Sequence, residues 1–139
     1  MTATAFVNGR VLSERGFEPD LSVIVEDGYI VAVLPGPPPG GAQAVDLQGR
    51  YLAPGFIDTQ VNGGGDVLFN DAPTVEGLRT IAQAHRRFGT TGMMPTLISD
   101  DVEVMLRAIA AVREAIAQGV PGILGIHLEG PYLAPARKG

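Results

Sequence analysis

Two of the residues best suited to chemistry lie on the last predicted strand of this chain. His127 and Glu129 lie at the end of the apolar segment GILGIHLEG, directly before Gly130 and Pro131. A carboxylate at a buried strand end costs several kcal/mol unless it is paired or bound to a metal ion. Glu129 is therefore a candidate metal ligand, with a structural salt bridge as the alternative. His127 lies lower on the strand, so packing or support of the site is favoured over direct ligation.

A second polar group follows an earlier predicted strand, GFIDTQV, which ends near Gln60 and Asn62. These two residues and Asp58 share parity, so a regular strand would point all three side chains to one side. Glycines at 63–65 then allow the backbone to approach a neighbour closely, or only form a tight turn. Two strands therefore deliver polar side chains to one place. This pattern indicates a hydrolytic or metal-binding site of an α/β fold, but by itself it is not specific to one reaction.

The elements that carry these residues alternate from residue 54 onward. Strands are predicted near 55–61, 90–98 and 122–129, and helices near 75–88 and 101–118, which gives the order β-α-β-α-β of a parallel sheet. In such folds, ligands bind at the carboxyl ends of the strands. The same ends hold the polar residues, so the organisation and the candidate site agree.

Helix signals support this reading. Thr74 is expected to cap the first helix and Gly89 to end it, with Val75, Leu78, Ile81, Ala82 and Phe88 on its apolar face. His85 on this helix is expected to be structural or to face solvent. Asp100 and Glu103 have the spacing of a capping box for the second helix. The apolar stripe predicted for that helix is Met105, Leu106, Ile109, Val112 and Ile116.

Residues 1–53 have the pattern of a small β-domain. Asn8-Gly9 and Asp27-Gly28 each separate apolar runs and predict two-residue hairpins. The segment AVDLQGRYLAP predicts a further strand-turn-strand unit, and the proline-rich stretch at 35–41 predicts a surface loop. We find no candidate chemistry in this part.

Composition excludes several classes. The 139 residues carry a net charge of −5 and no cysteine, which argues against a nucleic-acid surface and excludes disulfides and thiolate metal sites. The Arg86-Arg87 pair is interpreted as the solvated end of a helix. We expect a cytoplasmic protein without a membrane segment or secretory signal. Neither a serine-hydrolase elbow nor a phosphate-binding Gly-Lys-Ser/Thr loop is present.

Longer motifs make a resemblance specific. The segment YLAPGFID, after a small β-domain, resembles the entry to the barrel of the amidohydrolase superfamily, most members of which carry a His-x-His pair where this chain has Gln60-Val61-Asn62. Together with GIHLEGPYLAP, the stretch GFIDTQVNGGGDVLFND resembles the N-acetylglucosamine-6-phosphate deacetylases. The resemblance implies an α/β fold: residues 1–53 as a small β-sandwich domain and 54–139 as the first units of an incomplete (β/α)8 TIM barrel.

The resemblance also implies a site. One divalent metal, zinc by expectation, is held by a glutamate that matches Glu129 and by two histidines from later strands. Gln60 and Asn62 replace the ligands of a second metal, His127 supports the site, and Gly130 and Pro131 begin the substrate loop. The aspartate that acts as general acid and base is expected beyond residue 139, so no catalytic residue is expected within this chain.

The implied reaction is hydrolysis of the acetamido group of N-acetylglucosamine 6-phosphate to glucosamine 6-phosphate and acetate, in amino-sugar metabolism. A full-length homodimer is expected, with this chain as an inactive N-terminal fragment. Two alternatives stay open: another amidohydrolase that acts on a cyclic amide or a nucleobase, or a truncated module without catalytic function.

Overall fold

The computed structural model describes residues 3–130 and residue 136. The chain divides into two compact units, Met1–Pro54 and Gly55–Gly139. Within the described residues, no helix combines the length and the apolar character that crossing a membrane requires.

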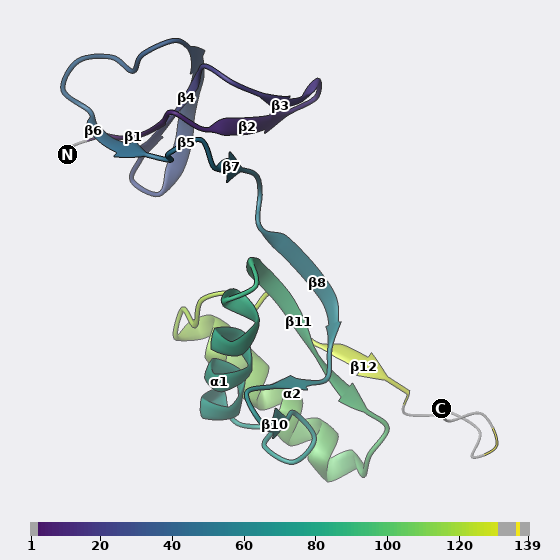
Figure 1. The fold of residues 1–139 in the computed structure, drawn as a ribbon. Coiled ribbons are helices and arrows are strands. Elements are labelled where there is room, and N and C mark those ends of the chain that lie inside the picture. The colour runs from purple at the N-terminus through teal and green to yellow at the C-terminus, as the bar shows by residue number, and fades with distance from the viewer. Residues whose placement is uncertain (1–2, 131–135, 137–139) are drawn as a thin grey trace. The chain divides into compact units, whose positions relative to one another are not determined.

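Two small sheets make up the first unit (Figure 1). The larger has the strand order β5-β4-β1-β6 and the smaller has the order β3-β2-β7. The bounds are β1 Thr4–Val7, β2 Arg10–Ser13, β3 Gly16–Glu18, β4 Leu21–Glu26, β5 Tyr29–Pro35, β6 Gln43–Asp46 and β7 Tyr51–Leu52. The proline-rich stretch lies between β5 and β6, in the predicted place.

The two predicted hairpins have different outcomes. Asp27-Gly28 joins the antiparallel strands β4 and β5, and both residues have positive φ, as the predicted turn requires. The hairpin predicted at Asn8-Gly9 is wrong, because β1 and β2 lie in different sheets. Asn8 instead bends the chain from one sheet into the other.

A parallel neighbour explains that bend. The segment containing β6 and β7 runs beside the segment containing β1 and β2 and pairs with it in both sheets. Asn8 and Gln48 both have φ of 54°, so the two segments bend together. Leu47 donates its N–H to Val7 (2.9 Å) and Arg10 donates to Arg50 (2.9 Å), which carries the pairing through the bend. The strand-turn-strand unit predicted at AVDLQGRYLAP is therefore not a hairpin either.

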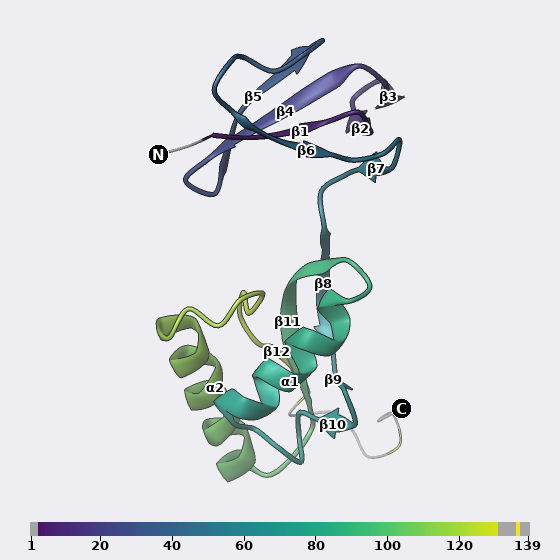
Figure 2. The same ribbon diagram turned by 60° about the vertical axis from the view of Figure 1, so that its left-hand side comes forward.

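The second unit follows the predicted order β-α-β-α-β, with a small extra hairpin (Figure 2). β8, β11 and β12 form a parallel sheet in the order β12-β11-β8, with both helices on one face. The bounds are β8 Phe56–Val61, β9 Gly63–Gly64, β10 Val67–Leu68, α1 Val75–Arg86, β11 Thr90–Ile98, α2 Val102–Ala117 and β12 His127–Glu129. The hairpin β9–β10, which begins in the glycine run, was not predicted.

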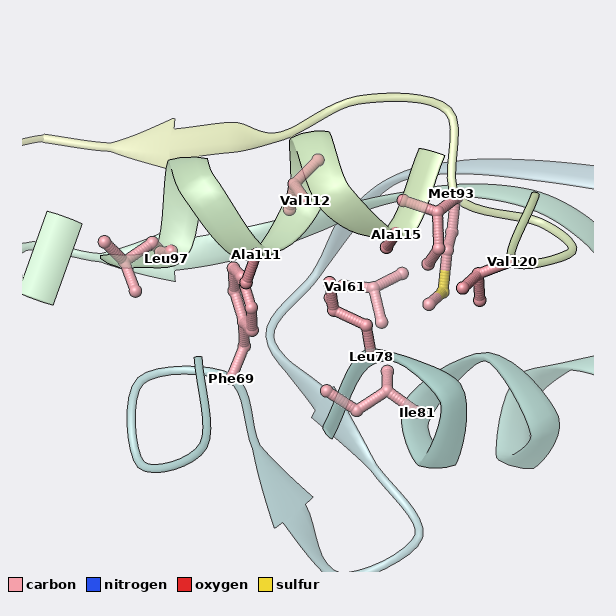
Figure 3. Packing of buried hydrophobic residues seen from close by; sticks show 12 residues of the cluster. Val61, Phe69, Leu78, Ile81, Met93, Leu97, Ala111, Val112, Ala115 and Val120 are labelled. Atoms are coloured by element: carbon pink, nitrogen blue, oxygen red, sulfur yellow. The ribbon is translucent and has the colours of Figure 1, made fainter. Parts of the chain in front are cut away.

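The core of this unit lies between the sheet and the two helices (Figure 3). Met93 and Leu97 of β11 and Leu78 and Ile81 of α1 are at most 2% exposed. Phe69, which follows β10, is fully buried and packs into the same cluster. Burial of these apolar side chains therefore holds the sheet against the two helices.

Helix α1 begins as predicted. The Thr74 hydroxyl accepts a hydrogen bond from the N–H of Gly77 (3.1 Å). Gly89, with φ of 95°, follows the end of the helix. Phe88 does not belong to the apolar face: it lies beyond the last helical residue and is 80% exposed.

The capping box predicted for α2 is wrong. Its N-cap residue is Asp101, which makes no side-chain cap hydrogen bond. The Asp100 carboxylate instead accepts from the N–H of Asp101 and from Asn70, so it is not available for a capping box with Glu103.

The apolar stripe predicted for α2 is correct only in part. Val112 is buried and Met105 packs against the core, but the buried face is rotated toward the alanines. Leu106 is 61% exposed and Ile116 is 47% exposed, whereas the buried residues are Ala108, Ala111, Val112 and Ala115. Alanines let the helix approach its neighbours closely, which the larger side chains would prevent.

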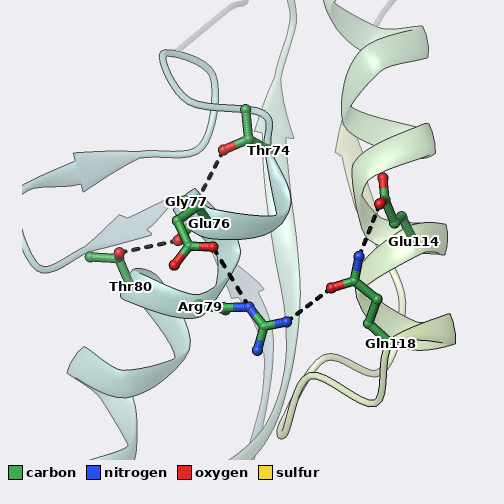
Figure 4. A network of polar contacts seen from close by, with 7 residues as sticks. All are labelled: Thr74, Glu76, Gly77, Arg79, Thr80, Glu114 and Gln118. Atoms are coloured by element: carbon green, nitrogen blue, oxygen red, sulfur yellow. Dashed lines mark hydrogen bonds and ion pairs between the residues drawn. The ribbon is translucent and has the colours of Figure 1, made fainter.

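Polar contacts connect the two helices on their outer side (Figure 4). Arg79 of α1 lies 3.7 Å from Glu76 and donates to the Gln118 side-chain oxygen (2.9 Å). Gln118 in turn donates to Glu114 (2.9 Å). Because all these groups are near solvent, each contact contributes little free energy, and the apolar core dominates.

Leu78→Ala tests this account of the core. We expect it to lower the free energy of unfolding of the 139-residue chain by about 2–5 kcal/mol, because the side chain is fully buried. Leu106→Ala is the matched control and should change it by less than about 0.5 kcal/mol, because Leu106 is exposed. Urea unfolding followed by the helical circular dichroism signal measures both. Equal losses would contradict the rotated face of α2.

Candidate site at the strand ends

The candidate site lies where the three parallel strands of the second unit end. Since β8, β11 and β12 run in the same direction, their carboxyl ends meet at one edge of the sheet. Here the Gln60 side-chain nitrogen lies 3.5 Å from a carboxylate oxygen of Glu129, although the residues are 69 positions apart. The two candidate residues are thus brought together from strands that flank β11 on opposite sides.

Alternation along the strands explains why these polar side chains share a face. Val61, Leu97 and Leu128 belong to or pack against the core beneath the helices. Their sequence neighbours Gln60, Thr96, His127 and Glu129 therefore point to the other face of the sheet. The site forms on the face that the helices do not cover.

The shared parity of Asp58 and Gln60 does not place their side chains on one side of β8. Asp58 and Val61 pair with Met93 and Pro95, so three steps along β8 match two steps along β11. This bulge breaks the regular alternation between Asp58 and Gln60. The Asp58 carboxylate accepts a hydrogen bond from the N–H of Gln60 (3.1 Å), so it binds its own strand.

His127 lies one level below Glu129 and contacts a buried threonine. Its Nδ1 is 3.1 Å from the Thr96 hydroxyl, and Thr96 is fully buried on β11 opposite His127 in register. This contact occupies Nδ1 and leaves Nε2 as the ring nitrogen open to a further partner. The side chain is half-buried.

The glycine run packs against α1. The Gly63 carbonyl lies 2.8 Å from His85 Nε2, so His85 has a structural partner on the loop that follows β8. A Cβ at Gly64 would lie 2.9 Å from the same ring nitrogen, and one at Gly65 would lie 3.1 Å from Thr80. Close approach to a helix therefore accounts for glycine at these positions. Asn62 is half-buried just before them, and its carbonyl accepts from the N–H of Phe69 (2.8 Å).

Gly130 follows Glu129 with φ of 106°, a conformation that residues with a side chain rarely adopt. A Cβ here would also overlap the Ser99 hydroxyl. Glycine is thus required directly after Glu129. Pro131 lies outside the described residues.

Sequence reasoning missed two residues at this edge. The Ser99 hydroxyl donates to the Glu129 carbonyl oxygen (2.9 Å). The Asn70 side chain accepts from the N–H of Ile98 (3.0 Å) and donates to the Ile98 carbonyl (2.9 Å) and to Asp100 (2.8 Å). The hydrogen bonds from Asn70 and from the Asp101 N–H hold the pKa of the Asp100 carboxyl below its usual value. The sequence offered a signal for Ser99 only, because Ser99 directly follows the predicted strand at 90–98, whereas Asn70 follows β10, which was not predicted.

The donor set fits part of a metal site. Among residues 3–130 and 136, no three His, Cys, Asp or Glu side chains converge on one point. Glu129 provides one carboxylate, which is a suitable zinc ligand, and Gln60 directs an amide nitrogen toward it. These residues fit one part of the ligand set of a metal site, and the other ligands would have to come from outside the described residues.

A separate cavity of about 260 Å³ lies at the amino end of β11, lined by Arg79, Arg86 and Thr91 among others. None of the candidate site residues lines it. It therefore carries no part of the strand-end site.

Comparison with known proteins identifies relatives in sequence and in structure. No family model matches the chain. Over 93 residues, or 67% of the chain, it is 62% identical to an N-acetylgalactosamine-6-phosphate deacetylase of Shewanella sp. (strain ANA-3), covering 24% of that protein. Over 136 residues, or 97% of the chain, it is 36% identical to the N-acetylglucosamine-6-phosphate deacetylase of Haemophilus influenzae, covering 36% of that protein.

Solved structures agree. The N-acetylglucosamine-6-phosphate deacetylase from Pasteurella multocida matches 99% of this chain at 37% identity with a TM-score of 0.92, over 36% of its own length. A D-hydantoinase matches 91% of the chain at 21% identity with a TM-score of 0.61, which shows a shared fold only.

The fold, with polar residues at the ends of its parallel strands, is similar to that of the N-acetylglucosamine-6-phosphate deacetylase from Pasteurella multocida. In sequence, the chain is a homologue of the N-acetylglucosamine- and N-acetylgalactosamine-6-phosphate deacetylases, as its motifs indicated. It spans between 24% and 36% of the length of these two curated relatives.

Gly130→Ala tests the local geometry after Glu129. We expect the amides of β12 to exchange with solvent at least about tenfold faster, because the strained φ and the overlap with Ser99 destabilise the strand end. Gly119→Ala is the control: Gly119 has φ of 66° but open space around its Cβ position. Hydrogen exchange of the 139-residue chain measures both variants. Unchanged protection of β12 in Gly130→Ala would contradict the packing at Ser99.

Proposed function

We propose that this chain forms part of an enzyme that hydrolyses the acetamido group of an N-acetylated amino-sugar 6-phosphate, releasing acetate in amino-sugar metabolism. The substrate in this proposal is N-acetylglucosamine 6-phosphate and the sugar product is glucosamine 6-phosphate. The observation that carries the proposal is the meeting of Gln60 and Glu129 at the strand ends, in a chain with 36% identity to a deacetylase over nearly its whole length.

The barrel and the β-sandwich belong to this proposal. Three parallel strands with helices on one face correspond to the first units of a (β/α)8 barrel, and residues 1–53 to part of a sandwich domain. The remaining strands would supply two histidine ligands and the aspartate that acts as general acid and base. By itself, the segment 1–139 would therefore be inactive.

Glu129 would hold the metal through its carboxylate, with Gln60 beside it. A bound zinc ion lowers the pKa of a coordinated water to about 7 and polarises a carbonyl group, which is the chemistry that amide hydrolysis needs. Gln60 and Asn62 are neutral amides in the positions of two ligands, which supports a site with one metal. His127 would support Glu129 from below through its contact with Thr96. Gly130 and Pro131 would begin the loop over the substrate.

The epimer of the substrate is a separate question. The relative with 62% identity is named for N-acetylgalactosamine 6-phosphate, which differs only at the C4 hydroxyl. This observation favours a second candidate function, deacetylation of the galactosamine epimer. The shared metal chemistry would be the same for both sugars, so only a direct comparison of substrates separates them.

Two alternatives have less support. The likeness to a D-hydantoinase, an enzyme of cyclic amides by its name, is at 21% identity and extends to the fold alone. A truncated module without catalysis would have no use for Glu129 beside Gln60 at the strand ends. We further propose a cytoplasmic, homodimeric enzyme that contacts neither nucleic acid nor membrane, in keeping with the acidic composition.

The activity assay uses the complete polypeptide that carries this segment. We expect acetate release from N-acetylglucosamine 6-phosphate or its galactosamine epimer, and at least about a hundredfold lower kcat/KM for the sugars without phosphate, because phosphate binding contributes to transition-state stabilisation. Residues 1–139 alone serve as the control and should show no turnover. Turnover of the segment within about tenfold of the complete protein would overturn the proposal.

Glu129→Gln tests the assigned ligand. The change keeps the size of the side chain and removes its charge, so we expect zinc affinity and kcat to fall at least about tenfold. Elemental analysis should give one metal per unmodified complete chain and much less than one in the variant. Thr59→Val, at an exposed neighbouring strand position, is the control. Full metal content in Glu129→Gln would exclude this residue as a ligand.

A further inference from the structure

A second set of residues, from the loops after β10 and β11, stabilises the edge of the sheet on which Glu129 lies. The backbone of β8 stops pairing with β11 at the level of Val61 and Pro95. Ile98, three residues further along β11, is still extended and lies opposite Glu129 in the register of β12. The polar groups of Ile98 on the side away from β12 need other partners at this level.

Asn70 provides those partners. Its side-chain oxygen accepts from the N–H of Ile98 (3.0 Å) and its nitrogen donates to the Ile98 carbonyl (2.9 Å). One carboxamide thus makes the two hydrogen bonds that a neighbouring strand would make through its peptide groups. The same nitrogen also contacts the Asp100 carboxylate at 2.8 Å, so both residues that flank Ser99 are held.

Ser99 then connects β11 to β12. Its hydroxyl donates to the carbonyl oxygen of Glu129 (2.9 Å), and the bare Cα of Gly130 leaves room for it. The connection therefore runs from the loop after β10, through the end of β11, to the backbone of Glu129. It fixes the residue from which the carboxylate extends, on the same edge where Gln60 meets that carboxylate.

We propose that Asn70 and Ser99 are positioning residues that set the backbone of Glu129 for metal binding. The proposal rests on the proposed function, because it takes Glu129 as the metal ligand. Neither residue needs to touch metal or substrate. Carboxamide chemistry explains Asn at 70, because aspartate could not donate to the Ile98 carbonyl and would repel Asp100.

The experiment measures zinc affinity of the metal-free complete polypeptide by competition with a chromophoric chelator. Ser99→Ala and Asn70→Ala should each weaken zinc binding by about tenfold, with kcat falling in parallel and KM for the sugar phosphate within about twofold. Ser99→Thr keeps the hydroxyl and should restore affinity to within about threefold. The double variant should lose less than the product of the single losses, because both residues act on one backbone position.

Gln118→Ala is the matched control. It removes a comparable polar contact, the hydrogen bond from Arg79 (2.9 Å), at a position away from the strand-end residues. It should leave zinc affinity unchanged. If Asn70→Ala does not fold, Ser99→Ala still decides the question, because Ser99 is exposed and its substitution removes only the hydroxyl.

The outcomes separate the two proposals. Zinc affinity equal to the unmodified protein in folded Ser99→Ala would overturn the positioning role while leaving the deacetylase proposal intact. Absence of both zinc binding and acetate release in the unmodified complete polypeptide would overturn the proposed function itself. Equal losses in Gln118→Ala and Ser99→Ala would also count against positioning, because general loosening would then explain both.

Discussion

The parallel pairing of β11 with β8 on one side and β12 on the other is the constraint on which the site depends. It brings Gln60 and Glu129 to one edge although they are distant in sequence. The core beneath the helices maintains it, because Met93 and Leu97 alternate along β11 with side chains that face the other way. Burial on one face therefore determines which polar residues meet on the opposite face.

Local patterns predicted the elements of the second unit well. Alternating strand and helix signals gave the β-α-β-α-β order, and Thr74 caps α1 as its position indicated. Strand-end polarity alone brought Gln60 and Glu129 into consideration. These features follow from residues close together in sequence, where propensity and periodicity carry the most information.

Features that depend on distant neighbours could not be predicted. Asn8-Gly9 has the composition of a hairpin turn, yet parallel pairing with the segment around Gln48 carries the chain into another sheet. Asp100 has the spacing of a helix cap, but Asn70 binds its carboxylate from another loop. The buried face of α2 consists mainly of alanines, while Leu106 stays exposed. The space that the sheet leaves for the helix, rather than side-chain hydrophobicity, determines which face of α2 is buried. In each case a tertiary contact overrides the local signal.

The most direct test of the account is the position of the metal relative to these strand ends. A crystal structure of the complete polypeptide with zinc, with data collected at the zinc absorption edge, locates it by anomalous scattering. The account predicts one anomalous peak about 2.0–2.2 Å from a Glu129 carboxylate oxygen, with Gln60 beside that carboxylate and no second metal at Gln60 and Asn62. A peak bound by other residues, with Glu129 turned away from it, would contradict the account.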